Sequence, residues 1–134
     1  MNSSFRQVQS PAVAPPSGAF SHATVIPVGD ARLIFVSGQV PVDAAGTLVG
    51  AGDMEAQTEQ VLHNLQLVLQ DCGSDLREVV KLTSFVTDAG ARAAFSKVRN
   101  RVFADSRPAS TFVEVSSLVH PQWLVEIEAV AVSR

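Results

Sequence analysis

The run Leu33-Ile34-Phe35-Val36 is apolar at every position of a predicted strand. Successive side chains of a strand point to opposite faces of its sheet, so both faces of this strand need to be covered. The chain has only two segments with helical periodicity, and two helices cover one face of a sheet. The sequence therefore predicts a homo-oligomer, in which the second face packs against another subunit.

The other strands are predicted from short β-branched runs separated by turn residues. Gly29-Asp30 forms a tight turn between two such runs, which predicts a β-hairpin near the start of the chain. A late proline, Pro108, marks the entrance to another strand because proline is costly inside a central strand. The predicted strands are residues 20–28, 31–40, 78–86, about 110–115 and 124–132.

Two segments carry the single apolar stripe of an amphipathic helix. The first runs from Met54 to Leu69, with Asp53 as its N-cap and Gly73 as its C-terminal stop. The second follows Asp88. Its apolar face consists of Ala91, Ala94, Phe95, Val98 and Val102. The order β-β-α-β-α-β-β predicts one two-layer α+β domain over residues 1–134, with about residues 1–18 as an irregular lead-in.

Composition excludes several classes of protein. A net charge of -3, without any Lys/Arg-rich run, gives no electrostatic argument for nucleic acid as a partner. No apolar run reaches the roughly 18 residues of a membrane span, and the N-terminal stretch lacks the apolar core of a signal peptide. The one cysteine, Cys72, is expected to be a buried thiol at a helix end, so we expect a soluble, cytoplasmic protein.

Signatures of metal, phosphate or nucleotide binding are absent from the sequence, which contains no CxxC, HExxH or phosphate loop. The histidines His22, His63 and His120 lack metal-ligand spacing. His63 falls on the polar side of the first helix, where a solvated residue is expected. We therefore expect no metal and no cofactor.

The last strand places Glu126 and Glu128 on one face, together with Leu124 and Val130. One interpretation is a solvated edge that carries two carboxylates. The other is that one glutamate faces a cleft, where it accepts a proton from water or holds a substrate amine. The pattern of residues alone leaves both open.

Residues 107–115, RPASTFVEV, read as a loop that delivers hydroxyl and aromatic side chains to the start of a strand. Ser110 and Phe112 share one strand face, and Thr111 lies on the other. Such side chains suit a small polar ligand, with Arg107 nearby as a cation, and backbone N–H groups here could bind a carbonyl-like oxygen. They suit ordinary turn hydrogen bonding equally well.

Six segments occur in an order that resembles the RidA/YjgF family of reactive-intermediate deaminases. They are GAFSHA (18–23), IFVSGQVP (34–41), QTEQVLHNLQLVL (57–69), VVKLTSFVTD (79–88), RPASTFVEV (107–115) and LVEIEAVAV (124–132). The resemblance implies a chorismate-mutase-like (YjgF-like) subunit that forms a homotrimer with ligand clefts between subunits. It also implies hydrolysis of enamines and imines, such as 2-aminoacrylate, to a keto acid and ammonia without metal or cofactor.

The resemblance also implies roles for individual residues. Glu126 matches the family's late glutamate, which is implicated in placing the attacking water. Residues 18–21 match a glycine-proline-tyrosine-serine motif, and residues 37–39 match a serine-glycine-glutamine motif. The implied substrate-binding side chains are Phe20, Ser37, Gln39, Ser110, Thr111, Phe112, Trp123 and Arg107.

The sequence departs from the family pattern at three of these positions. The family's Pro-Ala-Arg-Ser/Thr motif reads Pro-Ala-Ser-Thr here, so Ser110 replaces the arginine that grips a substrate carboxylate. Phe20 lacks the hydroxyl of the family's tyrosine, and Phe112 stands where a cysteine is common. We therefore expect poor activity on 2-aminoacrylate, and it stays open whether Arg99, Arg101 or Arg107 substitutes for the missing arginine.

Three functions follow from this pattern. The first is a cofactor-free hydrolase or deaminase acting on a small enamine, imine or related metabolite in a cleft between subunits. The second is a non-catalytic trimeric small-molecule-binding or regulatory protein, favoured by the missing arginine and tyrosine. The third is a specialised step in a biosynthetic or degradative pathway.

Overall fold

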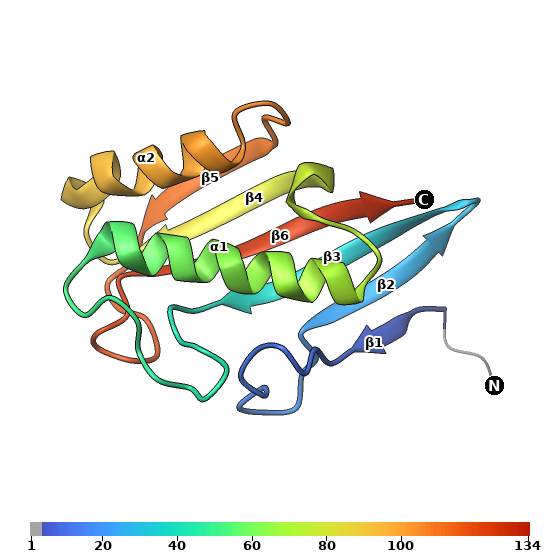
Figure 1. Cartoon of the computed structure of the whole chain (residues 1–134), viewed down its shortest axis with the longest axis horizontal. Coiled ribbons are helices and arrows are strands. Elements are labelled where there is room, and N and C mark those ends of the chain that lie inside the picture. Colours follow the sequence, from blue (N-terminus) through green and yellow to red (C-terminus); the bar gives the residue numbers. More distant parts are fainter. Residues whose placement is uncertain (1–3) are drawn as a thin grey trace.

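The computed structural model describes residues 4–134, which form one six-stranded sheet with two helices on the same face (Figure 1). The strands are β1 Arg6–Val8, β2 Ala23–Val28, β3 Ala31–Gln39, β4 Val79–Val86, β5 Ala109–Glu114 and β6 Val125–Ser133. The helices are α1 Met54–Asp71 and α2 Arg92–Val102, each joined to its neighbours through loops and short 3₁₀ turns. This arrangement confirms the predicted α+β fold.

The strand order across the sheet is β1-β2-β3-β6-β4-β5. Only β4 and β5 run parallel, because α2 returns the chain to the same end of the sheet before β5 begins. The last strand, β6, pairs with β3 on one side and with β4 on the other. This central place puts the two glutamates of β6 in the middle of the sheet, so the interpretation of a solvated edge is wrong.

Strand β1 is a correction to the expected irregular lead-in of about residues 1–18. It pairs antiparallel with β2, Arg6 opposite Val25 and Val8 opposite Ala23, and Val8 is buried. A strand of three residues is too short for an alternating pattern to reveal it in the sequence. Residues 1–3 of that lead-in lie outside the described residues.

The helix ends follow the predicted capping residues. The Asp53 side chain accepts a hydrogen bond from the backbone N–H of Ala56 at 3.1 Å, which satisfies one free donor of the first turn. Gly73 follows α1 with a φ of +77°, a conformation that glycine adopts without steric cost. The second helix begins at Arg92, a little later than expected, because Asp88 first caps a short 3₁₀ turn.

The core lies between the two helices and the sheet. It contains Ile34, Leu82 and Ile127 from the sheet, Leu65 from α1 and Phe95 from α2, all fully buried. Each such side chain contributes about 1.5–3 kcal/mol relative to an exposed one. Cys72 is buried as expected, and desolvation raises the pKa of its thiol.

The opposite face of the sheet is uncovered in the single chain. Phe35 on β3 is 43% exposed and Val113 on β5 is 37% exposed, and both point away from the helices. The predicted alternation of β6 is confirmed, because Val125 and Ile127 are buried under the helices while Glu126 and Glu128 lie on the open face. Among residues 4–134, no helix is long and apolar enough to cross a membrane.

Candidate functional site

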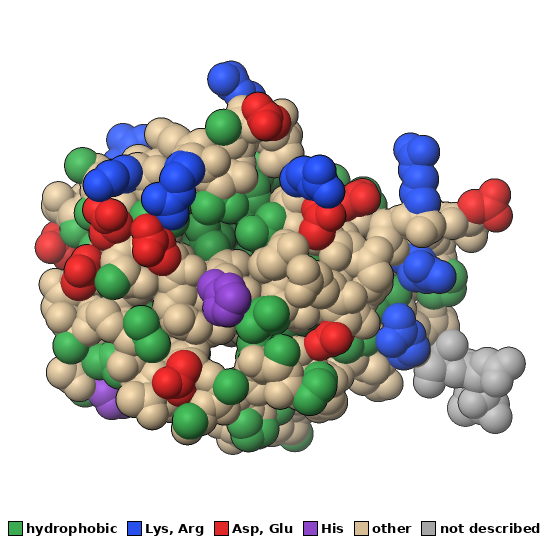
Figure 2. Space-filling view, viewed as in Figure 1, with side chains coloured by type: hydrophobic (Ala, Val, Ile, Leu, Met, Phe, Trp, Pro, Cys, Tyr) green, Lys and Arg blue, Asp and Glu red, His purple; other side chains and the backbone are tan. Residues whose placement is uncertain are grey.

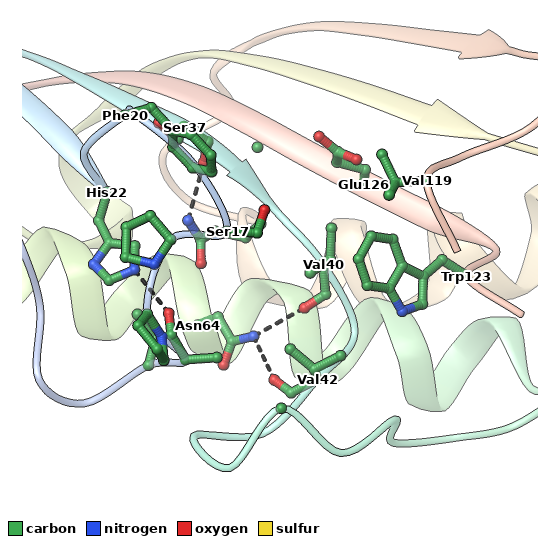
Figure 3. A pocket seen from close by; sticks show the side chains of 17 residues that line it. Ser17, Phe20, His22, Ser37, Val40, Val42, Asn64, Val119, Trp123 and Glu126 are labelled. Atoms are coloured by element: carbon green, nitrogen blue, oxygen red, sulfur yellow. Dashed lines mark hydrogen bonds between the residues drawn. The ribbon is translucent and has the colours of Figure 1, made fainter. Parts of the chain in front are cut away.

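A pocket of about 380 Å³ opens between the segment before β2, the end of β3 and the start of β6 (Figure 3). Figure 2 shows the molecule hollowed between the segment before β2 and the loop after β3. Most of the pocket wall is apolar. The wall includes Val13, Pro15, Phe20, Val40, Val119 and Trp123. A shape and lining of this kind suit a small ligand with few polar groups.

Glu126 lies at one end of this pocket, beside Val119 (Figure 3). Burial raises the pKa of its carboxyl group, and the nearby charge of Glu128 raises it further. Its carboxylate lies over Gly38 of β3, where a Cβ would come within 2.9 Å of Glu126 Cδ. A carboxyl group with a raised pKa is suited to take up and release a proton near neutral pH.

The segment before β2 is held by His22, which is buried at the edge of the pocket. The backbone N–H of Ser10 donates to His22 Nδ1 at 2.8 Å, and His22 Nε2 lies 2.8 Å from the carbonyl of Ala14. Because Nδ1 accepts, these contacts assign the proton to Nε2 and make the imidazole neutral. The lead-in thus becomes one wall of the pocket, a role for His22 that the sequence left unclear.

Two buried amides of α1 hold the other loops of the site. Asn64 Nδ2 donates to the carbonyls of Val40 and Val42 at 3.0 and 2.8 Å (Figure 3). Gln57 Nε2 donates to the carbonyls of Gly50 and Gln122, and Gln57 Oε1 accepts from the N–H of Leu124 at 2.8 Å.

Our reading of the sequence did not single out Gln57 or Asn64. The available signal was the position of each amide within the apolar stripe of α1, where a polar side chain needs a buried partner. Their partners lie in loops far along the chain, so the sequence could not identify what they bind.

The structure brings five of the expected site residues together in the Glu126 pocket. Phe20 lies at its mouth and is 50% exposed, and Trp123 approaches from the loop before β6. Ser37 Oγ donates to the carbonyl of Ser21 at 2.6 Å, and Gln39 Nε2 donates to the carbonyl of Ser37. These two polar side chains therefore shape the backbone around Glu126.

The other expected residues lie elsewhere in the chain. Ser110 and Arg107 line a second pocket near the end of α2, together with Arg99. Thr111 lies on the open face of the sheet, where its hydroxyl accepts from Lys81 Nζ at 2.6 Å. Phe112 packs under α2, with its ring centroid 4.9 Å from that of Phe95.

The remaining histidines and Arg101 occupy peripheral places. His63 and His120 are exposed, and Arg101 forms an ion pair with Glu59 at 3.1 Å. Within the part of the chain that the structure describes, no group of three or more His, Cys, Asp or Glu residues could hold a metal ion.

A two-layer α+β subunit with a small apolar pocket at the end of its central strands defines a protein of the YjgF-like class. The chain belongs to the Endoribonuclease L-PSP family, whose pattern it matches over residues 11–133. This is the RidA/YjgF family that the sequence resembles.

Similar proteins come from distant organisms. The chain is 40% identical to Protein DfrA of Myxococcus xanthus over 116 residues, which cover 87% of this chain and 86% of the relative. It is 35% identical to the 3-aminoacrylate deaminase RutC of Acinetobacter baylyi over 100 residues, or 75% of this chain and 79% of the relative. The crystal structure of the yeast protein YEO7 superposes with a TM-score of 0.88 at 33% identity, covering 97% of this chain and 99% of that one.

Proposed function

We propose that this protein is a cofactor-free hydrolase that deaminates a small imine or enamine, with Glu126 as its general base. The observation that carries the proposal is the half-buried Glu126 carboxyl group, whose pKa is raised, at the end of an apolar pocket. The relative described as a 3-aminoacrylate deaminase supports the same reaction class. A reducing, cytoplasmic location fits the single buried thiol and is part of the proposal.

The proposed reaction begins when Glu126 takes a proton from water as the water oxygen bonds to the imine carbon. The C=N double bond becomes a single bond, and its electron pair moves to nitrogen. Protonation of that nitrogen by the Glu126 carboxyl group, followed by cleavage of the C–N bond, releases ammonia and leaves a carbonyl product. One water is consumed, and the glutamate returns to its ionised form.

The lining of the pocket indicates the class of substrate. Among the described residues that line it, Glu126 is the only Asp, Glu, Lys or Arg, and the imidazole of His22 is neutral in the observed contacts. An ionised carboxylate is attracted to a carboxylate substrate only if a cation offsets the charge. We therefore infer an uncharged or iminium substrate with apolar substituents, and poor turnover of 2-aminoacrylate.

The proposal includes a homotrimer in which a neighbouring subunit covers the open sheet face. Phe35 and Val113 on that face are exposed in the single chain, as is Val80. Exposed apolar side chains spread across one sheet face are typical of a subunit interface. Sedimentation equilibrium should give three times the chain mass of 14.2 kDa, and Phe35→Lys should shift the protein towards monomer. A monomeric wild-type protein would contradict this part of the proposal.

The direct test is ammonia release from a panel of imines and enamines, measured for the wild type and two matched variants. Glu126→Gln should reduce turnover by about 100- to 10,000-fold, the usual contribution of a general base. Glu128→Gln removes the same charge two residues away, outside the pocket, and should retain turnover of the same order. Equal activity in wild type and Glu126→Gln would exclude the proposed mechanism, and so would cleavage of RNA without turnover of any imine.

The second candidate is a non-catalytic small-molecule-binding protein, favoured because Phe20 brings an apolar ring to the pocket mouth where the family has a tyrosine. Calorimetry against the same panel separates the two functions. Binding of a compound in the micromolar range without any turnover would support this candidate. Turnover that depends on Glu126 would eliminate it.

A further inference from the structure

We propose that the second pocket, formed by the end of α2 and the start of β5, is a binding site for a small oxyanion held by Arg99 and Arg107. The pocket has a volume of about 470 Å³. Its lining consists of Arg99, Asn100, Phe103, Ala104, Arg107, Pro108 and Ser110. It shares no lining residue with the Glu126 pocket, so the inference does not depend on the proposed hydrolase activity.

The guanidinium of Arg99 is fixed in place by three contacts. Its Nη1 donates to Ser110 Oγ at 3.1 Å, and its Nε donates to Asn100 Oδ1 at 2.8 Å. Its Cζ lies 5.5 Å from the centroid of the Phe95 ring, within the range of a cation–π contact. A held guanidinium loses little conformational freedom when it binds an anion, and its other N–H groups stay available.

Charge balance distinguishes Arg99 from its neighbours on α2. Lys97 pairs with Glu55 at 3.2 Å and Arg101 with Glu59 at 3.1 Å. Figure 2 shows these cations over α2 beside the acidic side chains of α1. Within residues 4–134, neither Arg99 nor Arg107 makes an ion pair, and no carboxylate lines their pocket. An anion between the two guanidinium groups would neutralise a like-charge pair.

Arg107 adds a second observation. It is the only non-glycine residue of the described chain with a positive φ, at +48°. Side chains disfavour this conformation, and the proline that follows restricts the backbone further. Glycine would hold the turn at a lower conformational cost. The backbone therefore does not explain an arginine here, whereas an anion-binding guanidinium does.

The ligand class follows from the donors. A guanidinium presents parallel N–H groups that match the paired oxygens of a carboxylate or a phosphate, and the Ser110 hydroxyl adds a further donor. The acidic residue next in the loop, Asp105, is exposed and does not line the pocket. The competing explanation is that these arginines only complement the carbonyl end of the α2 dipole, which predicts a stability effect without anion binding.

The test is a titration of the full chain with inorganic phosphate and with acetate, followed by amide chemical shifts at constant ionic strength adjusted with chloride. We expect saturable shifts around residues 99–110 for at least one anion, and the stronger of the two identifies the source of the oxyanion. Arg99→Gln should weaken binding about 10- to 100-fold, the usual loss for a charge-assisted contact. Arg101→Gln, on the same helix but paired with Glu59, should change it by less than about twofold.

Arg107→Gly keeps the experiment interpretable, because this variant should fold at least as well as the wild type while it binds the anion about 10-fold more weakly. Glu126→Gln should leave anion binding unchanged, whatever it does to turnover. The inference is overturned if neither anion gives saturable shifts at millimolar concentration, or if Arg101→Gln weakens binding as much as Arg99→Gln. Binding of an RNA oligonucleotide without binding of either small anion would overturn it as well.

Discussion

The carboxylate of Glu126 on β6 lies against the backbone of Gly38 on β3, with room for no side chain between them. The pairing of β3 and β6 shifts register between Val36 and Gln39, at the same point. Irregularities of this kind commonly re-aim a side chain next to a functional site. The empty position at Gly38 thus decides where the Glu126 carboxylate can lie.

Gly38→Ala should displace the Glu126 carboxylate with little effect on stability. The added Cβ would meet the flexible end of a side chain rather than backbone atoms, and Gly38 has no positive φ. We expect a melting temperature close to that of the wild type and turnover reduced by about 100-fold, as for a misplaced catalytic group. Gly18→Ala is the control, since its Cβ would make ordinary contacts with Phe20. Full activity in Gly38→Ala would show that the carboxylate position is not critical.

The raised pKa of Glu126 predicts a pH-dependent contribution to stability. Between its ordinary pKa and the raised value, the folded protein holds a proton that the unfolded chain has lost. The free energy of unfolding therefore falls as pH rises through this window. Glu126→Gln should melt at a higher temperature than the wild type at neutral pH, and the difference should shrink as pH falls through the window. A difference that is constant with pH would contradict the raised pKa.

Ser84→Ala should stabilise the protein. Ser84 is fully buried on β4, opposite Phe112 and Ile127, and its hydroxyl has no hydrogen-bond partner. Removing a buried, unsatisfied hydroxyl should raise the free energy of unfolding by about 1 kcal/mol in urea titrations. Ser37→Ala makes the same chemical change where the hydroxyl donates to Ser21, and it should lower stability by about 1 kcal/mol. The two changes having the same sign would refute this account.

Gln57→Leu should loosen the loop that carries Trp123. The substitution leaves the carbonyls of Gly50 and Gln122 and the N–H of Leu124 without their partner, at a cost of about 3 kcal/mol. Trp123 is the only tryptophan and the chain has no tyrosine, so its fluorescence reports on this loop alone. We expect red-shifted emission before global unfolding.

The matched control for this loop is Gln70→Leu, because Gln70 is exposed on the same helix. It should leave both the emission and the stability unchanged. Identical spectra for Gln57→Leu and the wild type would show that Gln57 does not hold the loop.

The expected site residues divide according to how local their signal is. Glu126 was identified because an alternating strand and a family motif both mark it, and Phe20, Ser37 and Gln39 came from motifs as well. Phe112 came from the same kind of motif, but its ring packs under α2. A motif says which residues occur together in sequence and does not say which side of a sheet each one faces after α2 has docked.

The sequence by itself determined the helices, the strands after residue 20 and the division of β6 into a buried and an open face. These features depend on periods of two and 3.6 residues, which act between near neighbours. Tertiary structure alone decided that Glu126 enters the pocket while Glu128 does not, because the register of β3 and the gap at Gly38 set that difference. It also decided the partners of Gln57, which lie up to 67 residues away. Hydrogen bonds across such separations depend on how the layers pack, and no local pattern records them.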